Sequence, residues 1–328
     1  MRSADMKVVH LVLSNSFAGI EQHVNELLVN INNADTILIC NESIGENFDS
    51  RISTIKIKNI GRRSFFGKHK LKKLINNIAP DIVHTHGSKT TSIVKSINKN
   101  NYKHIATVHG IKKDIKVYES ADFVIGVSEN AISHINAKKK VITNWWQPNL
   151  KKIESSKKEF ALAVGRLEKV KGFDLLISAW KNIKSSLVII GSGQEKESLT
   201  KLIEECGLNN KIKIIDEIKS DELNNYYSKA SVLIISSINE GGPRVALEAL
   251  FLKIPVLSTN VGHMNQIFPN EFLAEKNNVA SLTKLLEDYV DDIDLLNQSA
   301  IFEYVKDEFS VEEKVQQTLE VYKDILQS

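Results

Sequence analysis

The chain has 328 residues, of which 42% are hydrophobic and 25% are charged, as in ordinary globular proteins. At roughly 100–200 residues per domain, this length predicts two domains, each with its own core. Only two cysteines are present, Cys40 and Cys206, and their wide separation excludes a disulfide framework or a zinc site built from cysteines.

Charge is distributed unevenly along the chain. Residues 1–150 contain 21 Lys and Arg against 12 Asp and Glu, which gives +9, whereas the remaining residues contain 22 against 28, which gives −6. The two values add up to the net charge of +3. This asymmetry supports two domains and predicts an anionic partner for the first of them.

No secretory or membrane-spanning segment is expected. The apolar run over residues 8–13 is too short for the central region of a signal peptide. No run of apolar residues approaches the ~20 that a membrane helix requires. We therefore expect a cytoplasmic protein.

Short apolar runs alternate with helical patterns along the first half of the chain. The first run is followed by Ile20, Val24, Leu27 and Ile31, whose spacing predicts a helix. A second helix is predicted over residues 65–78, where the following proline ends it. The predicted strands cover residues 7–13, 36–40, 81–84, 104–108, 122–127 and 140–143.

The same alternation restarts after a polar stretch at residues 151–158. Strands this apolar must be covered on both faces, which favours parallel sheets. The predicted fold class is therefore α/β, with two doubly wound, Rossmann-like domains joined near residues 147–158. In the second half we predict strands at 160–164, 187–190, 212–215, 232–235 and 255–258, and helices near 172–182, 194–206, 220–229, 243–252 and from about 278 onward.

Loops that follow strands are the first places to look for chemistry, because ligands bind outside the carboxyl ends of parallel strands. Gly19 belongs to a loop of small residues before a helix, which either binds a phosphate or forms a tight turn. His109 ends another strand and can donate to a sugar hydroxyl or an oxyanion. His84 and His86 also lie at a strand end, but no carboxylate or cysteine joins these histidines at ligand spacing. We predict no metal site and expect most of the histidines to be structural.

Two cations flank the first strand-to-helix turn of the second half. Arg166 offers a planar fork and Lys171 a compact charge, and both suit a diphosphate. Solvated surface cations are the alternative interpretation. Gly191 lies in a Gly-Ser-Gly turn after the next strand, which by itself is a weak signal.

Residues 236–249 carry the strongest pattern in the sequence. Gly241 and Gly242 expose backbone N–H groups just before a helix that begins around Pro243. Glu240 and Glu248 flank this turn, where carboxylates can accept hydrogen bonds from sugar and ribose hydroxyls while the helix start faces the phosphates. The alternative is a capped helix with one exposed and one paired glutamate.

Basic residues gather at the start of the predicted helix 65–78, beside Phe65 and Phe66. Its apolar residues, among them Phe66, Leu71 and Ile75, can line one face. Either this face packs on the sheet and the lysines are merely solvated, or the surface docks on an anionic membrane. The candidate docking residues are Arg62, Arg63, Lys68, Lys70, Lys72 and Lys73.

Taken in this order, the motifs resemble those of the family 4 glycosyltransferases of the GT-B fold. A G-R-L-x(3)-K-G motif runs from Gly165 to Gly172, and a Glu-x(7)-Glu motif joins Glu240 to Glu248. Residues 81–86, residues 107–110 and the terminal helix also resemble the family, so the match covers most of the chain. The resemblance implies an acceptor-side domain (1–147) and a nucleotide-sugar domain (148–308) that face a central cleft, and a terminal helix (309–328) that returns to the first domain.

The resemblance also implies a retaining transferase that moves a hexosyl or N-acetylhexosaminyl group from a UDP- or GDP-sugar to a glycan or lipid-linked acceptor. Such enzymes build bacterial surface polysaccharides, including lipopolysaccharide, O-antigen and capsule. Cofactors, metal ions and nucleic acids are not expected as partners. The implied catalytic residues are His109, Arg166, Lys171 and Glu240, and the implied donor-binding residues are Gly19, Gly191, Gly241, Gly242, Pro243, Arg244 and Glu248.

Three alternatives remain at this point. A catalytically silent binding subunit of the same fold would have lost one of Arg166, Lys171, Glu240 or Glu248, and all four are present. A nucleotide-sugar epimerase shares the architecture but not this Glu-x(7)-Glu context. A nicotinamide dehydrogenase requires a full glycine-rich fingerprint after the first strand, and Gly19 alone does not supply it.

Overall fold

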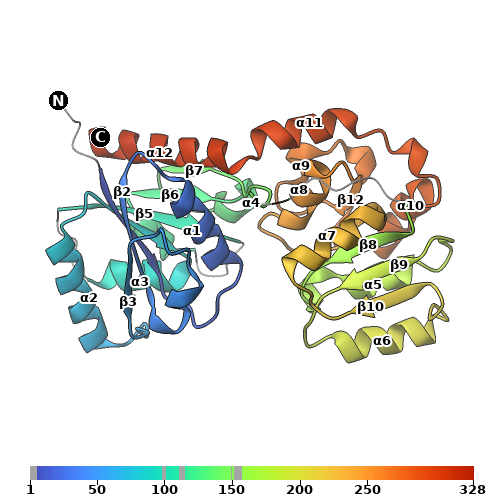
Figure 1. Cartoon of the computed structure of the whole chain (residues 1–328), viewed down its shortest axis with the longest axis horizontal. Coiled ribbons are helices and arrows are strands. Elements are labelled where there is room, and N and C mark those ends of the chain that lie inside the picture. The colour runs from blue at the N-terminus through green and yellow to red at the C-terminus, as the bar shows by residue number, and fades with distance from the viewer. Residues whose placement is uncertain (1–5, 98–100, 111–114, 149, 151–156) are drawn as a thin grey trace. The chain divides into compact units, whose positions relative to one another are not determined.

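The chain folds into two compact units in the computed structural model (Figure 1). The structure describes residues 6–97, 101–110, 115–148, 150 and 157–328, without the side chains of residues 220 and 221. Unit 1 comprises Met1–Asn144 with Val311–Ser328, and unit 2 comprises Trp145–Ser310. Most of the polar stretch that marked the predicted junction, residues 151–156, lies outside the described residues.

Unit 1 contains a seven-stranded, fully parallel sheet in the order β3-β2-β1-β4-β5-β6-β7. The short edge strand β3 was not predicted, because its Thr-Ile-Lys-Ile sequence is only half-buried and lacks a continuous apolar run. The strands are β1 (Lys7–Val12), β2 (Asp35–Asn41), β3 (Thr54–Ile57), β4 (Ile82–His86), β5 (Lys103–Val108), β6 (Phe123–Gly126) and β7 (Lys139–Val141).

Helices cover both faces of this sheet, as the apolar strands require. The final helix α12 belongs to unit 1, where it packs against α1 and buries Tyr322 completely (Figure 1). The helices of unit 1 are α1 (Gly19–Asn30), α2 (Phe65–Ile78), α3 (Ser88–Ser96), α4 (Glu129–Ile132) and α12 (Val311–Gln327).

Unit 2 contains a six-stranded parallel sheet in the order β10-β9-β8-β11-β12-β13. Its strands are β8 (Phe160–Val164), β9 (Leu187–Ile190), β10 (Ile212–Ile215), β11 (Ala230–Ile235), β12 (Val256–Thr259) and β13 (Leu273–Ala274). Its helices are α5 (Phe173–Ala179), α6 (Lys196–Glu205), α7 (Ser220–Lys229), α8 (Arg244–Phe251), α9 (Met264–Ile267), α10 (Val279–Tyr289) and α11 (Ser299–Glu308).

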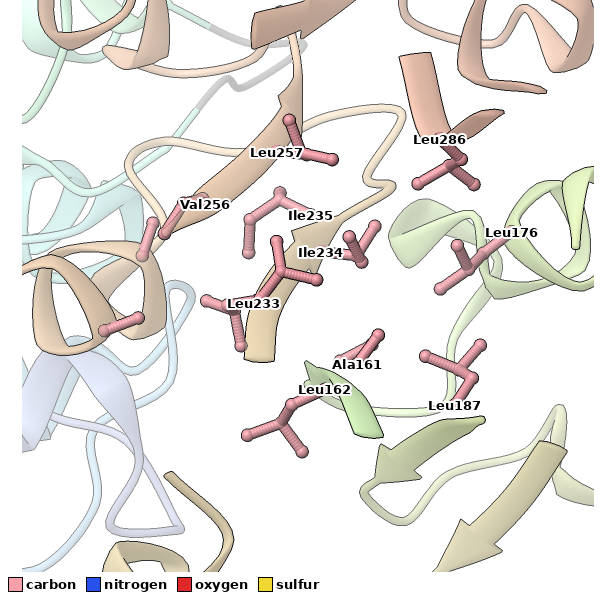
Figure 2. Packing of buried hydrophobic residues seen from close by; sticks show 14 of the residues in the cluster. Ala161, Leu162, Leu176, Leu187, Leu233, Ile234, Ile235, Val256, Leu257 and Leu286 are labelled. Atoms are coloured by element: carbon pink, nitrogen blue, oxygen red, sulfur yellow. The ribbon is translucent and has the colours of Figure 1, made fainter. Parts of the chain in front are cut away.

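The core of unit 2 lies on both sides of its central strands. In β11, Leu233 and Ile234 point to opposite faces, and Ile234 points toward Leu176 of α5 and Leu286 of α10, which belong to the same buried cluster (Figure 2). Both residues of β11 are almost fully buried. A strand that buries both faces has no room for polar side chains, so the polar residues gather in the loops beyond its end.

Both sheets reverse their strand order at one place. The reversal lies between β1 and β4 in unit 1 and between β8 and β11 in unit 2. Adjacent connections leave such a switch point in opposite directions, which opens a crevice at the carboxyl ends of the strands. The predicted α/β doubly wound architecture is confirmed, and each unit has its own edge at which a ligand can bind.

Candidate functional site

A cavity of about 390 Å³ lies at the carboxyl edge of the unit 2 sheet. Its wall includes Gly165 and Arg166 after β8, Gly191 after β9, and Glu248 from α8. The structure therefore brings together one predicted catalytic residue, Arg166, and two predicted donor-binding residues, Gly191 and Glu248, from two loops and a helix that are far apart in the sequence. Sequence reasoning missed the other lining residues, which are Gln147, Val164, Ile190, Ser192, Glu217, Ile218 and Leu223.

Gly191 is required by close packing of two loops. A Cβ atom built on this residue would lie 1.8 Å from the carbonyl oxygen of Gly165, so no larger residue fits without a backbone shift. The Leu167 N–H donates to the carbonyl of Ser192 at 2.9 Å, which fixes the same contact. Part of the Gly-Ser-Gly signal is thus structural, since the turn holds the wall of the cavity in place.

Lys171 and Glu240 form an ion pair beside this cavity. Their side chains are only 19% and 15% exposed, and the Ser237 hydroxyl donates to Glu240 Oε1 at 3.0 Å. The Lys171 stem runs along Gly165, where a Cβ would lie 3.3 Å from its Cε. Two predicted catalytic residues, 69 positions apart, therefore meet at one place.

Backbone contacts join the loop of Lys171 to the loop of Glu240. The Ser236 hydroxyl donates to the carbonyl of Lys171 at 2.9 Å, and the Ile238 N–H donates to the carbonyl of Val170 at 2.8 Å. Gly172 has a φ of +62°, and a Cβ there would lie 2.3 Å from the carbonyl oxygen of Ser236. In the Lys-Gly pair of the motif, Lys171 thus provides the charge, and Gly172 allows the two loops to approach closely.

Arg166 is more open than Lys171. Its side chain is 70% exposed and pairs with Glu168, a neighbour in the same turn. An exposed pair of this kind adds little stability, so the guanidinium can exchange its partner for a ligand at small cost.

The loop before α8 is packed tightly. Pro243 is the N-cap of this helix, with φ −70° and ψ 106°. A Cβ on Gly262 would lie 3.0 Å from the carbonyl oxygen of Gly241 and 3.1 Å from the Cα of Gly242. Arg244 Nε donates to the carbonyl of Trp145 at 3.3 Å. These residues lie at the start of α8 and do not line the cavity described above.

Glu248 is buried and has a partner that the sequence did not reveal. The hydroxyl of Tyr227, on α7, donates to Glu248 Oε2 at 3.0 Å. Burial, followed by the charge of Glu248, raises the pKa of Tyr227 well above its ordinary value. Tyr227 therefore stays a hydrogen-bond donor and holds the carboxylate at the cavity wall.

Unit 1 has a smaller cavity of about 170 Å³ at the carboxyl ends of β1 and β4. Its wall includes Glu21, His86, Lys89 and His109. Glu21 accepts hydrogen bonds from the backbone N–H of Ala18, at 2.9 Å, and from a serine hydroxyl. A carboxylate thus already occupies the start of α1, which disfavours an anion beside Gly19. The phosphate contact of Gly19 stays a prediction.

Five histidines gather in and behind the wall of this cavity, and all but His109 are buried. They are His10, His23, His84, His86 and His109. Burial lowers the pKa of His10 to about 3 and lowers that of His84 and His86 well below the ordinary value. Sequence reasoning missed His10 and His23, because their neighbours in the cluster are distant in the sequence. His86, which contacts His10, lies on β4, and His109, which contacts His23, follows β5.

Two groups of these histidines have ring nitrogens close enough to hold a metal ion. They are His10, His84, His86 and His23, His86, His109, with ligand atoms within 4.8 Å of one another. The same nitrogens also lie at hydrogen-bonding distance from their neighbours, including 3.1 Å between His10 Nδ1 and His86 Nε2. The geometry therefore fits either ligation or a network of neutral rings.

The basic helix α2 divides into a buried and an exposed face. Leu71 and Ile75 pack into the core of unit 1, whereas Phe65 and Phe66 are 77% and 81% exposed. Phe66 thus does not belong to the apolar stripe that faces the core. It lies in the first turn of α2, which extends beyond the part of the helix that packs on the core. The candidate docking residues are exposed or half-buried on and just before this helix.

Among the residues described, none of the helices has the length and hydrophobicity to cross a membrane.

Comparison with known proteins identifies the family. The model of the family described as "Glycosyl transferases group 1" matches residues 147–301, and that of "Glycosyl transferase 4-like" matches residues 11–140. An uncharacterized glycosyltransferase of Methanocaldococcus jannaschii is 27% identical over 295 residues, which is 82% of this chain and 84% of that protein.

Two further matches show how far the similarity extends. The O-antigen biosynthesis glycosyltransferase WclY of Escherichia coli is 27% identical over 57% of this chain and 63% of its own length. The crystal structure of HepE from Anabaena in complex with UDP superposes with a TM-score of 0.83, at 17% identity, over 97% of this chain and 100% of that chain. With two glycosyltransferase models matching consecutive parts of the sequence and this fold in both units, the chain belongs to the family 4 glycosyltransferases of the GT-B fold.

Proposed function

We propose that this glycosyltransferase moves a sugar, with retention of anomeric configuration, from a UDP- or GDP-sugar to a glycan or lipid-linked acceptor. The observation that carries the proposal is the cavity of unit 2, where Arg166, Gly191 and Glu248 meet beside the Lys171–Glu240 pair. Cations, a close-packed glycine turn and a buried carboxylate are what a nucleoside diphosphate needs for its phosphates and its ribose.

Each residue has a separate role in this proposal. Arg166 and Lys171 bind the diphosphate and stabilise the charge that develops on the leaving group, which removes the need for a metal ion. Glu248, held by Tyr227, accepts hydrogen bonds from ribose hydroxyls. Glu240 contacts the transferred sugar, and His109 of unit 1 donates a hydrogen bond to a sugar hydroxyl. Gly241, Gly242, Pro243 and Arg244 shape the helix start that faces the phosphates.

The relatives support a place in polysaccharide synthesis. WclY is named for O-antigen biosynthesis, and HepE was solved with UDP. We infer that this chain acts in the cytoplasm on a bacterial surface polysaccharide, and that it transfers a hexosyl or N-acetylhexosaminyl group.

A donor panel tests the proposal. The purified chain is incubated with UDP- and GDP-sugars and candidate acceptors, in the presence of excess chelator, and release of nucleoside diphosphate is measured. We expect nucleoside diphosphate to be released from one class of donor, either UDP-sugars or GDP-sugars, and only when an acceptor is present. Binding without release for every donor would favour a silent subunit, and conversion of the donor to its epimer without an acceptor would favour an epimerase.

A second proposal concerns the surface around α2. We propose that it docks peripherally on an anionic membrane, where lipid-linked acceptors reside. Two exposed phenylalanines, Phe65 and Phe66, lie among the basic residues. The surface therefore combines apolar side chains that can insert into a membrane interface with positive charges that attract anionic lipids. Each basic residue near an anionic surface contributes about 1 kcal/mol, so five or six suffice without a membrane span.

Vesicle co-sedimentation tests this surface. We expect binding to vesicles with anionic lipid that weakens at high salt, and that is lost when Lys70, Lys72 and Lys73 are replaced by Glu. Replacement of both phenylalanines by Ser should weaken binding even at low salt. The matched control places three glutamates at Lys196, Lys201 and Lys211 of unit 2. Binding that ignores lipid charge would contradict the proposal.

A further inference from the structure

A continuous series of hydrogen-bonding contacts links the terminal helix to His109. It begins at Thr107 Oγ1, which lies 2.6 Å from His84 Nε2, and His84 Nδ1 lies 2.6 Å from the Tyr322 hydroxyl. The same hydroxyl lies 3.3 Å from His10 Nε2.

From His10 the series continues toward the cavity of unit 1. His10 Nδ1 lies 3.1 Å from His86 Nε2, and His86 Nδ1 lies 3.2 Å from His109 Nε2. Strands β1 and β4 supply three of these rings, because His10 and His84 are in register on the two neighbouring strands and His84 and His86 alternate onto the same face. His109 follows the end of β5.

The buried rings of this series are neutral. His10, His84 and His86 are almost fully buried, and burial holds the pKa of each below its ordinary value. Within the part of the chain that the structure describes, no Asp or Glu is among the groups that shift these pKa values, so no carboxylate there favours a buried imidazolium. A neutral imidazole has one nitrogen that donates and one that accepts.

This rule leaves the whole series only two consistent arrangements. In the first, every histidine carries its hydrogen on Nδ1, and each donor points toward His109. In the second, every histidine carries its hydrogen on Nε2, and each donor points back toward Thr107. A mixed arrangement either places two donors or two acceptors face to face, or has His84 and His10 both donate to the Tyr322 oxygen, which leaves the hydrogen of this buried hydroxyl without an acceptor in the series at an unfavourable cost. The tautomer of one ring therefore fixes the tautomer of all the others.

Thr107 decides between the two arrangements. In the first, its hydroxyl donates to His84 Nε2, and the last donor of the series is the His109 Nδ1–H in the wall of the cavity. In the second, Thr107 accepts from His84, and its own hydroxyl hydrogen needs another acceptor. Among the hydrogen bonds of the described residues, Thr107 Oγ1 has only the contact with His84. Because Thr107 is buried, an unpaired donor there is unfavourable, which favours the first arrangement.

We infer that His109 is held as the Nδ1–H tautomer, and that Tyr322 of α12 is a positioning residue that sets this tautomer through His10 and His86. His109 Nε2 accepts from His86, so its Nδ1 acts as a hydrogen-bond donor and not as a base. For catalysis this inference rests on the proposed function, in which His109 donates to a sugar hydroxyl. It also gives the terminal helix a role in the site that its packing alone does not reveal.

Nitrogen NMR of the full chain with ¹⁵N-labelled histidine tests the inference. Long-range correlations from the ring carbon-bound hydrogens distinguish a protonated from a bare ring nitrogen, and His109→Gln assigns the signals of His109. We expect His10, His84, His86 and His109 all in the Nδ1–H form. A hydrogen on His109 Nε2 in the unmodified protein would overturn the inference.

Two variants interrupt the series without removing a ring. Tyr322→Phe deletes the hydroxyl that donates to His10, and Thr107→Val deletes the first donor. We expect each to convert His109 from a single tautomer to a mixture, whereas Thr107→Ser should restore the Nδ1–H form. The matched control is Tyr102→Phe, which removes from unit 1 a tyrosine hydroxyl that has no hydrogen bond among the described residues. An unchanged His109 tautomer in both Tyr322→Phe and Thr107→Val would overturn the inference.

Metal analysis of the same samples separates ligation from hydrogen bonding. We expect the ring signals to be identical before and after treatment with chelator. One retained zinc ion per chain, with loss of the ring hydrogens of His86, would overturn the inference in favour of a metal site.

Kinetics then connects the tautomer to transfer. In Tyr322→Phe we expect kcat to fall about tenfold, while affinity for the nucleoside diphosphate at unit 2 stays unchanged. If the unmodified chain transfers no sugar, the proposed function fails, but the NMR result still decides the tautomer. If transfer occurs and kcat of Tyr322→Phe equals that of Tyr102→Phe, the positioning role is rejected.

Discussion

The two units share one architecture but differ in the chemistry at their carboxyl edges. In unit 2 the residues beyond the strands are charged and paired, with Lys171 on Glu240 and Arg166 on Glu168. In unit 1 the corresponding edge holds neutral imidazoles that bond to one another and to Tyr322. Eight of the nine histidines lie before residue 150, so this difference is already present in the sequence.

The difference shows that the sheet supplies the place and the loop residues supply the chemistry. In the proposed function, the charged edge of unit 2 binds a charged ligand when Arg166 or Lys171 exchanges its carboxylate partner for that ligand. A neutral hydrogen-bonded edge instead presents a donor of fixed direction. The following predictions test this contrast.

Acidification should produce the largest difference between the units. The pKa of His10 is about 3 in the folded chain, and those of His84 and His86 are also lowered by burial, against an ordinary value of 6.5. Below pH 6.5 the unfolded chain therefore binds protons that the folded chain does not, so stability is complete above this pH and falls as the pH decreases. At pH 5 the loss is about 2 kcal/mol for His10, and His84 and His86 add to it in the same direction.

Hydrogen exchange of the intact chain at pH 7 and pH 5, corrected for intrinsic rates, measures this loss. We expect peptides from β1 and β4 to lose protection while those from β8 and β11 keep it. His134→Gln, which changes an exposed histidine, should leave the pH dependence unaltered. Equal protection of β1 at both pH values would contradict neutral burial of the cluster.

Removal of a cation from unit 2 should weaken the donor site strongly. Lys171→Ala should reduce affinity for the nucleoside diphosphate by about 1.5–3 kcal/mol, or about tenfold to a hundredfold, because a charge-assisted contact is lost. Lys169→Ala is the matched control, since Lys169 pairs with Asp174 at the surface of the same turn. Calorimetric titration compares the two, and thermal unfolding shows whether Glu240 tolerates the loss of its partner. Equal affinities in the two variants would remove Lys171 from the site.

Two glycines should respond in opposite ways. Gly191→Ala introduces a Cβ that would lie 1.8 Å from a carbonyl oxygen, so the loops must separate, at a cost of about 1–3 kcal/mol. At Gly19 nothing lies within 4 Å of an added Cβ, and Gly19→Ala should stabilise the chain by about 0.4–1 kcal/mol through the unfolded state. Chemical denaturation measures both. An unchanged or increased stability of Gly191→Ala would show that the unit 2 loop is not held by this close approach.

Much of the fold followed from local pattern. The predicted strands at 160–164, 187–190 and 212–215 match β8, β9 and β10 residue for residue, because continuous apolar runs between polar turns have few other solutions. Strand β3 did not follow from local pattern, because an edge strand needs little burial and therefore no continuous apolar run. Phe66 also departed from the predicted apolar stripe, because spacing along a helix does not show where the packed surface ends.

The sequence by itself determined the two parallel sheets and which loops carry phosphate-binding and hydroxyl-binding residue types. Only the tertiary structure decided the partners of those residues, such as Tyr227 on Glu248 and Lys171 on Glu240. It also decided that Tyr322, near the end of the chain, contacts His10 and His84. Periodicity is a property of near neighbours along the chain, whereas these contacts join residues that become neighbours only after the sheets and helices have packed.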